Sequence, residues 1–169
     1  MGIFSKLFGK NTAAVPKCEP MTVYSPAEGT VIPLAEFPDA VFSQGVLGQG
    51  CGILPIGQQI CAPFHGTVIQ TSDTLHAVGL VSDDGVELLI HVGVDTVDMA
   101  GKGFEYHVKE GQKVHLGDPL ITFNRETIQA AGHSDAIAVI VTNSDEYAGV
   151  ELQRTGPVTQ RTEVLKVSK

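Results

Sequence analysis

The hydrophobic positions of this chain come in short runs, and from Met21 onward glycine or proline interrupts almost every run. Short apolar runs rich in Val, Ile and Thr and bounded by turn residues are typical of β-strands. Helix has few candidates, the best being residues 125–131, with a further turn at 145–148. The pattern therefore predicts an all-β protein with little helix.

One phrase of the sequence occurs twice. Residues 25–32 (SPAEGTVI) return as residues 62–69 (APFHGTVI), and residues 108–121 contain a third, related phrase with glycine turns. Glycine closes tight β corners because it tolerates positive φ. The recurrence predicts a duplicated β unit folded into an antiparallel sandwich or a flattened barrel.

Two histidines stand inside strand-like runs on either side of the turn signal at residues 82–85. A loop of two or four residues centred between Asp83 and Asp84 pairs residues whose numbers add to 167, as His76 and His91 do. A loop at Asp84 and Gly85 would make the two histidines diagonal neighbours, and a three-residue loop would separate their faces. The two imidazoles are predicted to be neighbours on one face of a hairpin.

Alternation along the second strand indicates which way His91 faces. Leu88, Ile90 and Val92 form the set typical of a core face, so Leu89 and His91 are expected to face outward. Paired imidazoles suit metal binding, acid–base catalysis or phosphoryl transfer through nitrogen, and geometry alone leaves these open. The other histidines are interpreted as structural or solvated: His65, which is placed in an exposed turn, His107, His115 and His133.

Size, charge and cysteine content narrow the class of protein. The 169 residues suffice for one domain with a core, and the formal charge of −8 argues against a nucleic-acid partner. Three cysteines without a C-x-x-C motif argue against a disulfide framework and for a reducing, cytoplasmic location, with Cys51 and Cys61 expected in the core. No apolar run approaches the ~20 residues of a membrane span.

The first residues differ from the rest of the chain. Residues 1–10 place Ile3, Phe4, Leu7 and Phe8 on one helical stripe with lysines away from it, which suits weak binding to an anionic membrane surface. A flexible tail is the alternative. Residues 1–20 are predicted to be this segment and a linker, and residues 21–169 the folded domain.

Several phrases in the same order carry a family resemblance that spans about Thr22 to Val167. They are PDAVF at 38–42, GQGCGILPIG at 48–57, APFHGT at 62–67, TLHA at 74–77, GVEL at 85–88, HVGVDTV at 91–97, GKGF at 101–104 and EGQKV at 110–114. With these phrases the chain resembles the glucose-type IIA component of the bacterial phosphoenolpyruvate:sugar phosphotransferase system.

The resemblance implies a flattened antiparallel β-sandwich of the duplicated hybrid-motif kind, with residues 21–169 as the IIA domain. It implies a phosphocarrier without a tightly bound cofactor or metal. The position of His91 would accept a phosphoryl group from the phosphohistidine of the carrier HPr and pass it to a cysteine of the IIB domain of a sugar permease. His76 and Thr74 would assist this transfer.

The resemblance also implies a rim of partner contacts. Asp39 and Asp95 are expected to meet basic groups of HPr, and an apolar rim is expected from Phe42, Val46, Val78 and Leu89. This rim is less aromatic than the family pattern, because Ser72, Val78, Leu89 and Val92 stand where phenylalanines are expected.

Three functions of other classes compete with this interpretation. One is a binding module that regulates transporters or kinases while it is unphosphorylated, a role that is compatible with phosphate transfer. A zinc-dependent hydrolase on a related β fold would use His91 and Asp95 as ligands, but the expected H-x-H pair is absent. A lipoyl- or biotin-type carrier would need a lysine in a suitable exposed hairpin, and this chain has none there.

Overall fold

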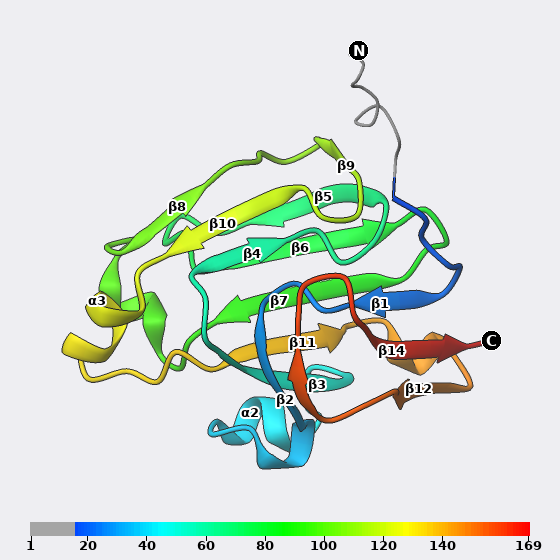
Figure 1. Cartoon of the computed structure of the whole chain (residues 1–169), viewed down its shortest axis with the longest axis horizontal. Coiled ribbons are helices and arrows are strands. Elements are labelled where there is room, and N and C mark those ends of the chain that lie inside the picture. Colours follow the sequence, from blue (N-terminus) through cyan, green and yellow to red (C-terminus); the bar gives the residue numbers. More distant parts are fainter. Residues whose placement is uncertain (1–15) are drawn as a thin grey trace, which may run out of the picture.

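The structure is a computed structural model, and it describes residues 16–169. The segment expected at the membrane, residues 1–10, lies outside the described residues. Figure 1 shows a molecule built mainly of strands. In chain order these are β1 (Thr22–Tyr24), β2 (Gly29–Pro33), β3 (Gln49–Pro55), β4 (Gln59–Cys61), β5 (Gly66–Thr71), β6 (Ala77–Ser82), β7 (Glu87–Val92), β8 (Phe104–Tyr106), β9 (Lys113–Val114), β10 (Pro119–Phe123), β11 (Ile137–Val141), β12 (Gly149–Leu152), β13 (Gly156–Val158) and β14 (Glu163–Ser168).

Helical segments are short. They are the 3-10 helices η1 (Leu34–Glu36), η2 (Thr96–Met99) and η3 (Ser144–Glu146) and the α-helices α2 (Ala40–Ser43) and α3 (Arg125–Ala130). The helix predicted over residues 125–131 is therefore confirmed, and η3 overlaps the turn expected at 145–148. Asn124 caps α3 by accepting a hydrogen bond from the Thr127 amide, which fits the preference for Asn before a helix.

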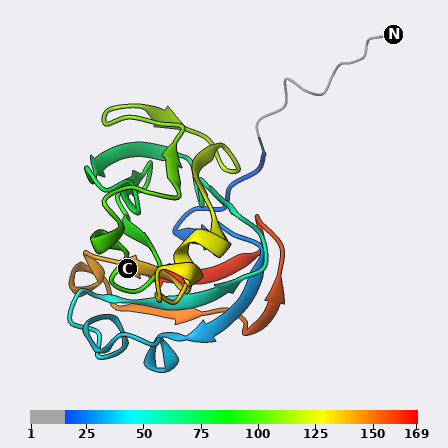
Figure 2. The same ribbon diagram turned by 90° about the vertical axis from the view of Figure 1, so that its left-hand side faces the viewer.

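The strands form one 8-stranded antiparallel sheet and two 3-stranded sheets. The large sheet has the order β13-β2-β3-β11-β7-β6-β5-β9, and the small sheets have the orders β1-β14-β12 and β4-β10-β8. Figure 2 shows the sheets curving around a common interior, as expected of a flattened sandwich. The predicted all-β class is confirmed.

The duplicated sequence phrase has a structural counterpart. The two copies lie side by side. The amide of Cys61, just before the second copy, donates to Pro26 O at 2.8 Å, and the amide of Tyr24, just before the first copy, donates to Pro63 O at 2.9 Å. The copies also start equivalent strands, β2 and β5, and each of these pairs with an edge strand of the large sheet. The sheet order is therefore symmetric about the contact between β7 and β11.

The turn between β6 and β7 differs from the prediction. Ser82 and Val86 close a three-residue loop, with Gly85 at φ +98°, and the paired residue numbers add to 168 instead of 167. A glycine at the third loop position accepts the left-handed conformation that this loop needs. His91 is therefore opposite Ala77, and the backbone carbonyl of His76 accepts from the Val92 amide at 2.8 Å.

Two apolar clusters lie on opposite faces of the large sheet. The main core contains Leu88, Ile90 and Val92 of β7 together with Cys51, and Cys61 is also buried, as expected. The smaller cluster lies on the outer face and contains Phe37, Phe42, Ala136, Ala138 and Ile140, with Leu89 packed against it. The helical segment over residues 34–43 thus covers the part of the outer face that adjoins His91.

Candidate functional site

His91 lies on the outer face of the large sheet, near the centre of its strand order. Its cross-strand neighbours are Ala77 of β6 and Ala138 of β11, so small side chains flank the imidazole on both sides. The Phe42 ring of α2 lies 5.0 Å from the His91 ring between centroids. The outward orientation predicted for His91 is confirmed.

The His91 ring is held in one tautomer by the backbone. Nδ1 lies 2.9 Å from the carbonyl oxygen of Gly93, and a carbonyl only accepts hydrogen bonds, so Nδ1 carries the proton. Nε2 then keeps an unprotonated lone pair. Gly93 has φ +86°, and a Cβ there would lie 2.3 Å from Thr96 Cγ2, so the turn that presents this carbonyl requires glycine.

His76 lies beside His91 because it belongs to the turn before β6 and not to the strand itself. Its ring centroid is 4.7 Å from that of His91, with an interplanar angle of 83°. A continued strand would have pointed His76 towards the core beside Val92, but Leu75 adopts φ +64° and redirects the chain. Thr74 Oγ1 lies 2.8 Å from His76 Nδ1 and fixes the ring. His76 and His91 are neighbours as predicted, but the cause is the turn at Leu75 and not the predicted strand register.

Burial favours the neutral form of both imidazoles. Burial, followed by the nearby His76, lowers the pKa of His91 to about 4, while Gly93 O, Asp39 and Asp95 oppose this shift. Burial also lowers the pKa of His76, against the opposing effect of the Thr74 backbone. An imidazole kept neutral at neutral pH retains its lone pair, which a nucleophile needs.

The acidic residues expected at the rim lie around His91. Asp39 precedes α2 and accepts the Val41 amide at 2.9 Å, so this carboxylate also caps the helix. Asp95 follows β7, is exposed, and has φ +59°. Both carboxylates raise the pKa of His91, which places their charge within its electrostatic reach.

The apolar rim differs from the expectation at Val78. Val46 is 68% exposed and Leu89 is partly buried on the outer face, whereas Phe42 is mostly buried. Val78 is opposite Ile90 in the core and 1% exposed, so its assignment to the rim is wrong. A register shift of one residue moves a side chain to the opposite face of a sheet, and the three-residue loop produces that shift.

Other residues at the site were not found from the sequence. Val41 exposes an apolar side chain on α2, which follows Asp39. Val97 does the same on η2, which follows Asp95. Tyr106 of β8 accepts a hydrogen bond from the Ser72 amide at 2.9 Å, and its hydroxyl donates to Ala77 O. Nothing near Tyr106 in the sequence signals this link, because its partners are about thirty residues away.

The remaining histidines and cysteines lie elsewhere. His65 is partly buried rather than exposed, since its Nδ1 accepts from the Leu116 amide at 2.9 Å and its Nε2 lies 3.1 Å from Pro16 O. Burial raises the pKa of Cys51 to about 12 and that of Cys61 to about 11, which makes both thiols unreactive.

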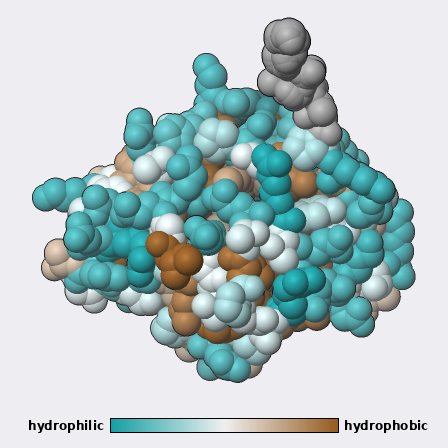
Figure 3. All heavy atoms as spheres, viewed as in Figure 1, coloured by the Kyte–Doolittle hydropathy of each residue, from teal (hydrophilic) through white to brown (hydrophobic). Residues whose placement is uncertain are grey.

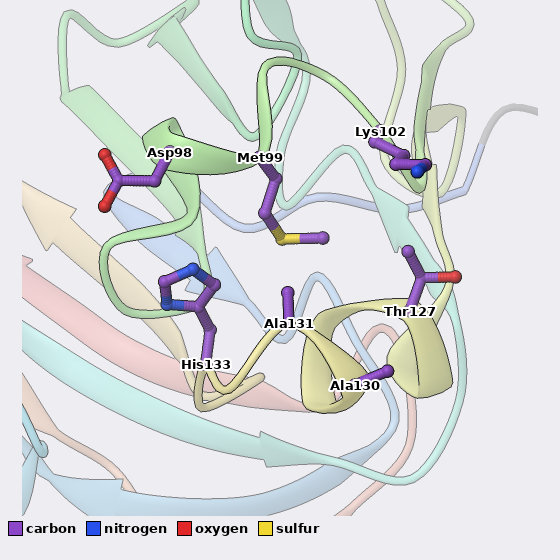
Figure 4. Close-up of a pocket in the computed structure, with 7 residues that line it drawn as sticks. All are labelled: Asp98, Met99, Lys102, Thr127, Ala130, Ala131 and His133. Atoms are coloured by element: carbon purple, nitrogen blue, oxygen red, sulfur yellow. The ribbon is translucent and has the colours of Figure 1, made fainter.

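Two further surface features are present on the described part of the chain. A hollow of about 530 Å³ lies between η2 and α3. Figure 4 shows Asp98 and His133 at one end of it, Lys102 and Thr127 at the other, and Met99 pointing into it. Figure 3 shows an apolar patch near β2 and β3, and Leu54 and Ile56 are exposed in this part of the chain. Neither feature contains a predicted site residue.

Residues 16–169 hold neither a cluster of metal ligands nor a membrane-spanning helix. No group of three or more His, Cys, Asp or Glu side chains in this part of the chain could hold a metal ion. No helix of the described region is long and apolar enough to span a bilayer.

Comparisons with known proteins agree with this site. Residues 21–147 match the family described as phosphoenolpyruvate-dependent sugar phosphotransferase system, EIIA 1. The glucose-specific EIIA component of Halalkalibacterium halodurans is 42% identical over 156 residues, covering 89% of this chain and 89% of the relative. The glucose-specific EIIA component of Staphylococcus aureus is 37% identical over 167 residues, covering 98% and 99%.

A fused relative and a solved structure extend the match. The β-glucoside-specific EIIBCA component of Bacillus subtilis is 41% identical over 160 residues, and this chain spans 26% of that longer protein. The glucose permease IIA of Mycoplasma capricolum has a TM-score of 0.76 at 33% identity, covering 85% of this chain and 93% of that one. Nothing in these comparisons supports a zinc hydrolase. The chain therefore belongs to the EIIA 1 family of the phosphoenolpyruvate-dependent sugar phosphotransferase system and is a phosphocarrier component of that system.

Proposed function

We propose that His91 Nε2 accepts a phosphoryl group from the phosphohistidine of HPr and passes it to the cysteine of a IIB domain. The observation that carries this proposal is the hydrogen bond from His91 Nδ1 to Gly93 O, which leaves the Nε2 lone pair free. In the first step Nε2 forms a P–N bond to phosphorus while the P–N bond of the donor breaks, so no oxidant or cofactor is needed.

His76 and Thr74 stabilise the phosphoryl group in transit. If the Thr74 hydroxyl donates to His76 Nδ1, the imidazole proton resides on Nε2, the other ring nitrogen. A donor beside a phosphorylated His91 stabilises the charge on the transferring group, and this electrostatic support is the main contribution that phosphoryl transfer requires.

The rim around His91 is where the partners bind. Asp39 and Asp95 offer negative charge to basic side chains of HPr, while Val46 and Leu89, beside Phe42, offer apolar contact. Transfer between these partners involves no nucleic acid and no tightly bound cofactor. The phosphoryl transfer, whose phosphate derives from phosphoenolpyruvate, takes place in the cytoplasm.

The bounds of the domain and the type of sugar permease are also proposals. Residues 21–169 form the carrier domain, supported by a family match that begins at residue 21 and a first strand that begins at Thr22. Residues 1–20 are an N-terminal segment and linker, and within them residues 1–10 bind weakly to anionic lipid. The glucose-specific relatives favour a glucose-type permease as the acceptor.

The test is phosphorylation by the purified upstream proteins. The chain is incubated with phosphoenolpyruvate, enzyme I and HPr, and the acid-labile phosphate is counted by mass spectrometry. Wild type and a His107→Ala control should each take up one phosphoryl group, because the exposed His107 follows β8 and contacts Thr122 of β10, in a different sheet from His91. His91→Ala should take up none, and label retained on that variant would refute the assignment.

A further inference from the structure

The turn between β5 and β6, residues 72–76, is held at its two ends by a side chain from another sheet. The pairing of β5 with β6 ends at Thr71, and the next pair in the same register would be Ser72 and Ala77. Instead, the Ser72 amide donates to the Tyr106 hydroxyl at 2.9 Å, and that hydroxyl donates to Ala77 O. A phenolic hydroxyl of β8 therefore joins the two strands at the point where they stop pairing with each other.

This link decides where the pairing of the strands stops. A backbone amide carries one proton, and the proton of Ser72 is taken by the Tyr106 hydroxyl instead of by the opposite strand. Without the hydroxyl, the same amide and Ala77 O can pair directly, which draws β5 and β6 together by one further pair. The turn would then narrow to residues 73–76, and the side chains within it would move.

His76 is the residue of this turn that lies beside the phosphoryl acceptor. Its ring centroid is 4.7 Å from that of His91, and Thr74 Oγ1 lies 2.8 Å from its Nδ1. Leu75, between Thr74 and His76, has φ +64°. Such a conformation is unfavourable for leucine and persists only where the surrounding structure imposes it. The ends of the turn impose it, and Tyr106 holds those ends together.

The turn has a second attachment, on the side of β7. His76 O accepts from the Val92 amide at 2.8 Å, which fixes the backbone at one point. A single hydrogen bond leaves the direction of the turn open, because the chain can rotate about it. The Tyr106 hydroxyl supplies a further fixed point at Ser72 and Ala77. Together the two attachments define the direction in which the imidazole of His76 projects.

We propose that Tyr106 is a positioning residue for phosphoryl transfer, whose hydroxyl sets the turn that directs His76 at His91. The inference rests on the proposed role of His76 in stabilising the phosphoryl group in transit. Tyr106 acts through the backbone of the turn, since its hydroxyl bonds to Ser72 and Ala77. Because His76 supports the departure of the phosphoryl group, the effect falls on transfer to the IIB domain.

The experiment removes the hydroxyl and keeps the ring. The Tyr106 ring packs against the main core, and Tyr106→Phe retains that packing. Tyr147→Phe is the matched control, because it loses the same hydroxyl from another ring that packs against the main core. The Tyr147 hydroxyl lies near Gly85, beyond the opposite end of β6 from His76. Urea unfolding measures any loss of stability, and transfer is measured where each variant is fully folded.

The main readout is single-turnover transfer from each isolated phosphorylated variant to the IIB domain. Tyr106→Phe should slow this step about fivefold, less than His76→Gln does, because His76 is displaced but still present. The variant that combines both substitutions should be no slower than His76→Gln alone, since the hydroxyl acts through His76. Uptake from phospho-HPr should change by less than about twofold in Tyr106→Phe, and Tyr147→Phe should match wild type in both steps.

A second readout follows the His76 ring without any phosphoryl transfer. The ¹⁵N chemical shift of His76 Nδ1 reports the hydrogen bond with Thr74. This shift should change in Tyr106→Phe and stay the same in Tyr147→Phe. The NMR comparison therefore tests the placement of His76 separately from its role in transfer.

Three results would overturn the proposal. They are an unaltered His76 signal in Tyr106→Phe, normal transfer by Tyr106→Phe where His76→Gln is slow, and an equal slowing by Tyr106→Phe with and without His76. A failure of the proposed function looks different, because His76→Gln would then itself transfer at the normal rate, or wild type would take up no phosphoryl group on His91.

Discussion

His76 and His91 face each other edge to face, with ring centroids 4.7 Å apart, although they are not a cross-strand pair. His91 is part of a regular strand, whereas His76 belongs to the turn that precedes β6. One imidazole is therefore fixed by the sheet and the other by its own loop. This difference assigns them different roles, the first as nucleophile and the second as stabilising partner.

The first prediction concerns His76. Glutamine keeps a hydrogen-bond donor but cannot carry positive charge, so His76→Gln should still accept phosphate from HPr. It should pass that phosphate to the IIB domain at least tenfold more slowly, because charge stabilisation during departure is lost. Single-turnover transfer from the isolated phosphorylated variant measures this, and a normal rate would demote His76 to a structural neighbour.

The second prediction concerns the backbone at Leu75. Leu75 has φ +64° and packs beside Gly101, where a Cβ would lie 3.5 Å from Leu75 Cδ1. Asparagine tolerates this conformation and valine does not. Leu75→Val should therefore be less stable than Leu75→Asn by about 1 kcal/mol, despite its greater hydrophobicity. Only the valine variant should slow transfer to the IIB domain, and equal behaviour of the two in urea unfolding and transfer would contradict this.

The third prediction concerns pH. The pKa of His91 is about 4 in the folded chain, below the ordinary value of 6.5, so the unfolded chain binds more protons between these values. Stability should thus be complete above about pH 6.5 and fall as pH decreases towards 4, by up to about 1.4 kcal/mol per unit from this group. Urea unfolding at pH 7, 6 and 5 should show a shallower loss in His91→Gln. Equal slopes would show that His91 does not titrate in this way.

The fourth prediction concerns the two rim carboxylates. Asp39→Asn keeps the helix cap while removing its charge, and Asp95→Asn removes the exposed charge after β7. Each should slow association with HPr at low salt by severalfold, and the difference from wild type should shrink at high salt. Stopped-flow association at two ionic strengths tests this, with Asp145→Asn on η3 as a control that should match wild type.

Alternation in the sequence predicted the outward face of His91, and apolar surroundings predicted the buried cysteines, because both signals are local. The register between β6 and β7 could not be predicted from them, since Asp83, Asp84 and Gly85 permit loops of several lengths. That one-residue shift buried Val78 and would also have turned His76 inward, had Leu75 not adopted positive φ. The Tyr106 link arises from residues far apart in the sequence, which no local pattern brings together.

The central claim is that Nε2 of His91 carries the phosphoryl group. Its most direct test is the coupling between phosphorus and the ring nitrogens, measured by NMR on the chain labelled with ¹⁵N and phosphorylated by HPr. The account predicts a single phosphoryl group coupled to His91 Nε2, with Nδ1 still protonated against Gly93 O. Coupling to His91 Nδ1, or to any nitrogen of His76, would contradict it.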